Sequence, residues 1–83
     1  MKNCVFTLYN NLSCRYGDVM SYPTEGFAQK VLSSQLPKMN MDLKEYELCK
    51  IGEVDISTGV IEPCPVRRIP WNDVQPLEQK AEN

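Results

Sequence analysis

The stretch Glu45-Tyr-Glu-Leu-Cys-Lys-Ile-Gly-Glu-Val-Asp55, followed by Ile56-Ser-Thr-Gly59 and Val60-Ile-Glu62, decides the fold. Apolar and polar residues alternate along its first part, which is typical of a half-buried strand. The alternation shifts by one residue near Gly52, and this shift predicts a β-bulge. The loop that follows needs a positive φ angle at Gly59, after which the chain returns as a partner strand. The stretch is therefore predicted to form a β-hairpin.

Two more strands are predicted before this hairpin. Residues 2–9 carry apolar side chains on both of their alternating faces, so they should form an inner strand. Residues 10–18 are rich in turn formers and should connect it to the next element. Residues 19–22 then form a short second strand that ends at Pro23, because proline cannot donate a hydrogen bond to the sheet.

An amphipathic helix is predicted between the second strand and the hairpin. Thr24 is a suitable N-cap, and Glu25 in the first turn interacts favourably with the helix dipole. Pro37 should end the helix, and residues 42–45 fit a capping box around a single turn. The apolar face of the helix comprises Phe27, Ala28, Val31, Leu32 and Leu36, and the polar face comprises Gln29, Lys30, Ser33 and Ser34.

The C-terminal part of the sequence is rich in proline. Prolines at positions 63, 65, 70 and 76 should prevent regular structure after Glu62, and the polar last residues should be frayed. The predicted fold is an α+β domain over residues 1–62, in which a small antiparallel sheet of three to four strands, in the order β(β)αββ, carries one helix on one face. Residues 63–83 form an extended tail. Its apolar side chains indicate that residues 63–71 lie on a surface, which is the chain's own sheet, a second subunit or a foreign partner.

The composition excludes several classes of function. The 83 residues include 9 Lys+Arg, 11 Asp+Glu and no His, so the net charge is -2. Without histidine there is no Ser-His or Cys-His catalysis, and we expect a noncatalytic protein without a cofactor. The widely spaced Cys4, Cys14, Cys49 and Cys64 contain no C-x-x-C pair, which favours free thiols over a metal site. No run of 18 apolar residues occurs, so we expect a soluble intracellular protein.

Several segments resemble one viral family. The hairpin stretch Tyr46–Asp55 with Gly59-Val-Ile-Glu-Pro63, the strand Val5-Phe-Thr-Leu-Tyr9 and the helix start Thr24-Glu-Gly-Phe-Ala28 are similar to the small nonstructural protein of gokushovirus-type microviruses, which are phages with circular single-stranded DNA. The resemblance spans roughly residues 4–62. It implies expression in the cytoplasm of a bacterial host and absence from the mature virion, and it supplies no site residues.

Candidate binding residues come from the sequence itself. Proteins that bind single-stranded DNA combine cations with aromatic rings on which bases stack. Such residues occur as Arg15 and Tyr16 in the first loop and as Arg67, Arg68 and Trp71 in the tail. The alternative is that the aromatic residues pack within the fold, that Trp71 pins the tail to the body, and that the arginines are solvated.

Two functions follow from these observations. The first is a noncatalytic phage accessory protein that acts in genome replication or packaging and binds single-stranded DNA through these five residues. The second is an interaction module that binds a host or phage protein through a sheet edge or the proline-rich tail. A homo-oligomer is expected in both cases, because the sheet face opposite the helix has no partner within so small a chain.

Overall fold

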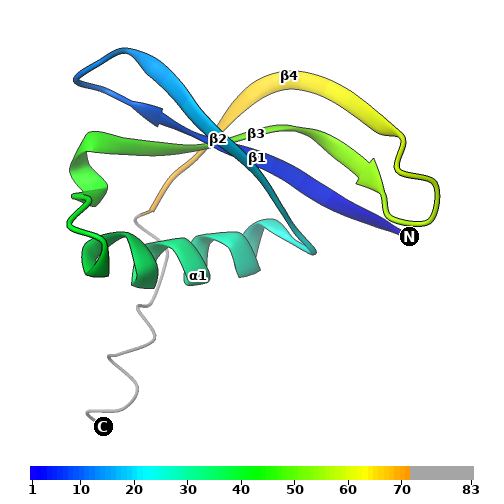
Figure 1. Ribbon diagram of the computed structural model, residues 1–83, viewed down its shortest axis with the longest axis horizontal. Coiled ribbons are helices and arrows are strands. Elements are labelled where there is room, and N and C mark those ends of the chain that lie inside the picture. The colour runs from blue at the N-terminus through cyan, green and yellow to red at the C-terminus, as the bar shows by residue number, and fades with distance from the viewer. Residues whose placement is uncertain (72–83) are drawn as a thin grey trace, which may run out of the picture.

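Four antiparallel strands in the order β2-β1-β3-β4 form one sheet, and a single helix covers one of its faces (Figure 1). The structure, a computed structural model, describes residues 1–71. The α+β class and the predicted single helix are confirmed. The elements are β1 (Lys2–Asn10), β2 (Arg15–Tyr22), α1 (Glu25–Lys38), the 3-10 turn η1 (Leu43–Glu45), β3 (Tyr46–Asp55) and β4 (Ile61–Ile69).

The predicted hairpin is formed by β3 and β4. Gly59 has a φ angle of 79°, as the turn requires, and its amide donates to the Asp55 carbonyl at 2.7 Å. The predicted bulge is also present. Val5 of β1 pairs with Gly52 and Phe6 pairs with Lys50, so Ile51 is the extra residue on β3. The bulge therefore lies directly beside the predicted glycine.

The core lies between the sheet and α1. Phe6, Leu8 and Leu48 from the two inner strands are buried against Ala28, Leu32 and Leu36 of the helix, and Ile69 closes the cluster from β4. Val5 and Cys49 are also buried, but they lie on the opposite side of the sheet and outside this cluster. The inner position predicted for residues 2–9 is confirmed, because β1 pairs with β2 on one side and with β3 on the other.

The start of the helix agrees with the prediction, whereas its end and its polar face do not. The Thr24 hydroxyl accepts a hydrogen bond from the Phe27 amide at 3.1 Å. Pro37 lies inside the last turn instead of ending the helix. Asn40, with a φ angle of 62°, ends it in a Schellman motif, in which the Met41 amide donates to the Leu36 carbonyl at 2.9 Å.

Two residues predicted on the polar face of the helix, Ser33 and Ser34, are buried. The Ser33 hydroxyl donates to the Lys30 carbonyl at 3.1 Å, which satisfies it within its own helix. Phe27, predicted on the apolar face, is 49% exposed, so the buried face of the helix differs from the one that its apolar residues indicate.

Two further predictions are wrong. Residues 15–18 belong to β2, so the first connection is a short turn and not a loop that extends to residue 18. Residues 63–69 form most of β4, so the prolines do not prevent regular structure after Glu62. Pro63 and Pro65 are tolerated because β4 is an edge strand whose pairing with β3 is irregular between Lys50 and Gly52. The predicted fraying concerns residues 77–83, which lie outside the described residues.

Candidate functional site

The two edges of the sheet differ in their capacity to accept another strand. On β4, Pro63 and Pro65 lack the amide hydrogens that strand pairing needs, and the irregular pairing with β3 distorts the edge. On β2, residues 15–22 contain no proline. Within residues 1–71, β1 is the only strand that pairs with β2, so the outer edge of β2 is open. This edge is the one able to accept an additional strand.

A bulge divides β2 into two parts. Thr7 of β1 pairs with Val19 and Tyr9 pairs with Tyr16, so two residues of β2, Gly17 and Asp18, stand opposite a single residue of β1. The Thr7 hydroxyl lies 3.1 Å from the Gly17 carbonyl oxygen and 3.0 Å from that of Asp18, and it donates to them. Residues 19–22 therefore form the regular part of the open edge.

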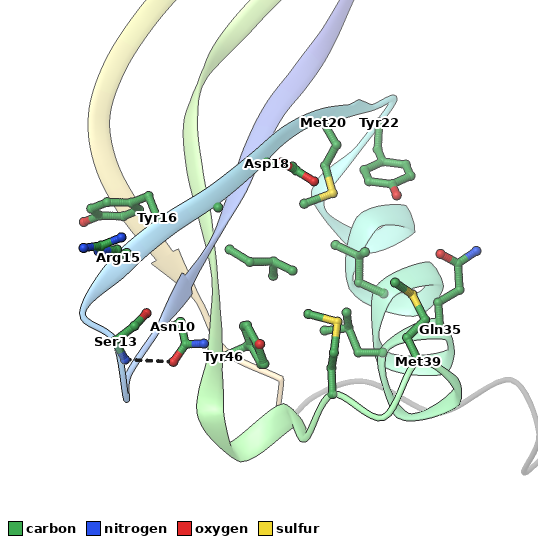
Figure 2. Close-up of a pocket in the computed structure, with 15 residues that line it drawn as sticks. Asn10, Ser13, Arg15, Tyr16, Asp18, Met20, Tyr22, Gln35, Met39 and Tyr46 are labelled. Carbon is green, nitrogen blue, oxygen red and sulfur yellow. Dashed lines mark hydrogen bonds between the residues drawn. The ribbon is translucent and has the colours of Figure 1, made fainter.

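A groove of about 460 Å³ runs between β2 and α1, directly beside this open edge (Figure 2). Its floor is apolar, and polar side chains such as Gln35 and Asn10 lie around it. Methionine is flexible and polarizable, so a groove rich in methionine adapts to different apolar side chains. The apolar lining comprises Leu8, Met20, Tyr22, Leu32, Leu36, Met39, Met41 and Tyr46.

Sequence reasoning missed this groove. Three of the four methionines of the chain line it, and they come from β2 and from the segment just after α1. Met39 and Met41 flank Asn40, the left-handed residue that ends the helix. The only available signal was this pair of methionines next to a helix end, and it does not reveal that Met20 lies opposite.

Charged residues of opposite sign lie along the groove. Arg15 begins β2 at one end of the groove, and Asp18 stands at the bulge. Within residues 1–71, no carboxylate lies within ion-pairing distance of Arg15. The strand cations that do hold a carboxylate are Lys2, Lys50, Arg67 and Arg68. Arg15 is therefore the strand cation whose charge remains available to a ligand.

We call the face of the sheet opposite α1 the open face, because no helix within residues 1–71 covers it; its centre at Val5 and Cys49 is buried, and its exposed part carries a cluster of aromatic rings. The rings of Tyr9 and Tyr16 lie 4.9 Å apart, and the Arg68 guanidinium lies 5.1 Å from the centre of the Tyr9 ring. Arg68 also pairs with Glu47 at 2.9 Å. A hydrogen bond with Cys14 raises the pKa of the Tyr9 hydroxyl above its ordinary value. We call Tyr9, Tyr16 and Arg68 the tyrosine cluster.

The structure separates the five predicted DNA-binding residues. Tyr16 and Arg68 each contact Tyr9 in the tyrosine cluster, whereas Arg67 is on the opposite face, where it pairs with Glu25. Trp71 packs against the core, and its indole nitrogen donates to the Tyr46 carbonyl at 2.9 Å. Trp71 thus pins the chain after β4 to the body, as in the alternative interpretation, and Arg15 lies at the groove.

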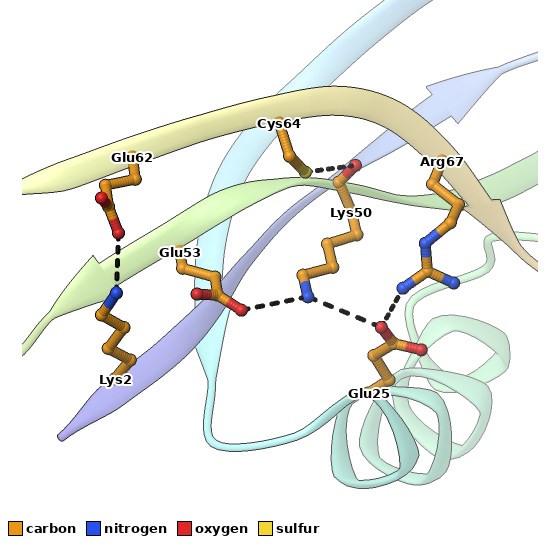
Figure 3. Close-up of polar contacts among 7 residues, drawn as sticks. All are labelled: Lys2, Glu25, Lys50, Glu53, Glu62, Cys64 and Arg67. Atoms are coloured by element: carbon orange, nitrogen blue, oxygen red, sulfur yellow. Dashed lines mark hydrogen bonds and ion pairs between the residues drawn. The ribbon is translucent and has the colours of Figure 1, made fainter.

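Ion pairs between opposite charges surround the first turn of α1 (Figure 3). The Lys50 ammonium lies 3.4 Å from Glu53 and 3.7 Å from Glu25, and Arg67 also pairs with Glu25. Burial by itself would lower the pKa of Lys50, but Cys4 and the carboxylates of Glu53 and Glu25 raise it, and the net shift is upward. The positive charge here is already neutralised, so this surface offers a polyanion little attraction.

The four cysteines are free thiols in different environments. Cys14 is exposed, Cys4 and Cys64 are half-buried, and Cys49 is fully buried. Burial raises the pKa of the Cys49 thiol. Within residues 1–71, no group of three or more His, Cys, Asp or Glu side chains gathers with the geometry of a metal site.

No protein-family model, curated protein or solved structure matches this chain. Within residues 1–71, none of the helical segments has the length and the hydropathy that a membrane-spanning helix requires.

Proposed function

We propose that this chain is a noncatalytic accessory protein that binds another protein through the outer edge of β2. The observation that carries the proposal is the open edge of β2 beside an apolar groove. An extended segment that pairs with a sheet edge gains main-chain hydrogen bonds, and pockets for alternate side chains provide specificity. The groove between β2 and α1 is such a pocket.

The sequence left two routes to a protein partner, a sheet edge or the proline-rich tail. Residues 63–69 are part of the chain's own sheet and Trp71 is anchored to Tyr46, which supports the sheet edge as the route proposed here. In the setting that the microvirus resemblance implies, the partner is a host or phage protein. The binding takes place in the bacterial cytoplasm during genome replication or packaging, and the protein is absent from the mature virion.

A selection from random peptides tests this function. Twelve-residue peptides displayed between constant flanking residues are selected on the full chain, and each enriched peptide is titrated against two variants. Met39→Asn removes an exposed apolar side chain of the groove, and Leu12→Asn removes an exposed one from the turn before β2. Partial burial of a methionine side chain is worth about 1 to 1.5 kcal/mol, so Met39→Asn should weaken binding about tenfold. Leu12→Asn should leave it unchanged.

Failure of the selection, or enriched peptides that bind both variants equally well, would refute the β2 edge as the binding surface.

The tyrosine cluster favours a second candidate function, the binding of single-stranded DNA on the open face. Tyr16 is 53% exposed and lies beside Tyr9, whose ring also contacts Arg68, so a base can stack there. Anisotropy of a labelled oligonucleotide at two salt concentrations tests this candidate. Arg68 would exchange its carboxylate partner Glu47 for a phosphate, so Arg68→Ala should reduce the slope of log K against log salt by about 0.7, the value for one phosphate contact on a single strand.

Arg67→Ala is the matched control, because Arg67 lies on the other face and holds Glu25. Absence of salt-dependent binding at micromolar concentrations, or equal effects of the two substitutions, would exclude this mode of DNA binding.

A further inference from the structure

We infer that the partner of the β2 edge is an extended segment with apolar side chains at alternate positions, followed by one Asp or Glu that meets Arg15. This inference rests on the proposed function and names the chemistry of the ligand at the same site. Two features of the edge carry it: the position of the groove relative to the regular part of β2, and the unbalanced charge at the beginning of the strand.

The apolar pattern follows from strand geometry. Met20 and Tyr22 lie on the helix side of β2 and line the groove, whereas Val19 lies on the open face of the sheet. In an added strand, alternate side chains point to the same face and are about 6.6 Å apart, twice the rise per residue. Two such side chains would therefore enter the groove from a segment paired with residues 19–22. The groove favours apolar side chains there, since methionine and leucine form its floor.

The direction of the segment follows from the pairing. Antiparallel pairs are slightly more stable per residue than parallel pairs, so the added strand runs opposite to β2. Its C-terminal part then lies beside the beginning of β2, where Arg15 is located. The acidic residue is expected about three positions after the residue opposite Val19, because each strand residue advances the chain by about 3.3 Å and the bulge shortens β2.

The charges along the β2 edge favour an acidic residue beside Arg15 over one elsewhere in the segment. Arg15 has no carboxylate partner within residues 1–71, so an acid beside it gains an ion pair without breaking one. Asp18 at the bulge repels an acid placed in the middle of the segment. The chain as a whole has a net charge of -2, so the attraction is local and depends on register.

The peptides selected on the full chain test this inference. The expected consensus has apolar residues at alternating positions and an Asp or Glu toward its C-terminal end. The consensus peptide is then synthesised with both termini capped, so that only a side chain can supply the carboxylate. Replacing its acid by the corresponding amide should weaken binding about two- to fivefold, which is the range for an exposed ion pair. Arg15→Ala should have the same effect on the acidic peptide and none on the amide peptide.

Two controls make the result specific. Lys30→Ala removes the same charge from an exposed position of α1 and should leave the affinity unchanged. Arg15→Glu should bind a peptide with Lys in place of the acid better than it binds the acidic peptide. The amides of an added strand point alternately toward β2 and away from it. N-methylation of the amides that face β2 should therefore abolish binding, and N-methylation of the other amides should be tolerated.

The outcomes separate the inference from the function on which it rests. The inference would be overturned if the enriched peptides bind Met39→Asn more weakly but contain no acid, or if Arg15→Ala does not change their affinity. Either result would leave the β2 edge as a binding surface. Peptides that tolerate N-methylation at every position would overturn strand addition itself.

Discussion

Replacing Gly52 by alanine should destabilise the protein through a clash with the neighbouring strand. Gly52 is buried between Val5 and Pro63, and a Cβ atom there would lie 2.6 Å from the Glu62 carbonyl oxygen and 3.2 Å from the Pro63 Cα. Both atoms belong to the backbone of β4, so the strand itself would have to move. Overpacking of this kind costs about 1 to 3 kcal/mol, and the lower entropy of the unfolded alanine variant offsets about 0.4 to 1 kcal/mol. The net loss should be about 1 to 2 kcal/mol.

Thermal unfolding followed by circular dichroism measures this loss. For a domain of this size, 1 kcal/mol corresponds to about 4 to 8 °C, so the Tm of Gly52→Ala should fall by about 5 to 15 °C. Gly26→Ala is the matched control. Nothing lies within 4 Å of a Cβ atom at Gly26 in α1, and alanine favours the helix by about 0.5 to 1 kcal/mol, so its Tm should rise. A Gly52→Ala variant as stable as the wild type would refute the close approach of β4 to the bulge of β3.

Three further predictions concern assembly, thiols and pH. Val19 and Val66 are exposed on the sheet face opposite α1 and should form the contact of a homodimer, so the mass from light scattering at tens of micromolar should exceed the monomer mass of 9.5 kDa. Val66→Lys should restore the monomer mass, and Leu12→Lys should not, because Leu12 is exposed but lies in the turn before β2. In the folded protein a thiol reagent should modify Cys14 fastest and Cys49 only on unfolding, and equal rates would contradict the burial of Cys49. The free energy of unfolding should decline as pH rises above 9.0, because the Cys49 thiol ionises in the unfolded chain before it ionises in the folded protein. It should decline further above 10.5, because the unfolded chain releases the Lys50 proton that the folded protein retains. Urea titrations should show that Cys49→Val removes the first part of this decline, and a decline confined to acidic pH would contradict both assignments.

The sequence predicted the elements whose signals are local. The loop at Gly59, the bulge near Gly52 and the Thr24 cap each depend on a few adjacent residues, and all three are present. The end of α1 was predicted wrongly, because a proline in the last turn of a helix removes few hydrogen bonds and Asn40 supplies the actual stop.

The sequence did not predict the features that depend on tertiary contacts. β4 incorporates two prolines because it is an edge strand, and a strand's place in a sheet is not a local property. Arg67 and Arg68 are adjacent in the sequence and were predicted to contact DNA together. Because they lie on a strand, their side chains point to opposite faces of the sheet. The groove joins residues about twenty positions apart, Met20 and Met39, and no spacing rule brings them together.

The proposal that the β2 edge binds an extended segment is tested most directly by an NMR titration of the full chain with the selected peptide. Because strand addition pairs the outward amides of β2, those amides should become protected from hydrogen exchange at alternate positions within residues 15–22. The largest chemical-shift changes should occur there and at the groove residues Leu32 and Leu36. Shifts confined to Tyr9 and Arg68 on the open face, with the exchange of the β2 amides unchanged, would contradict the account.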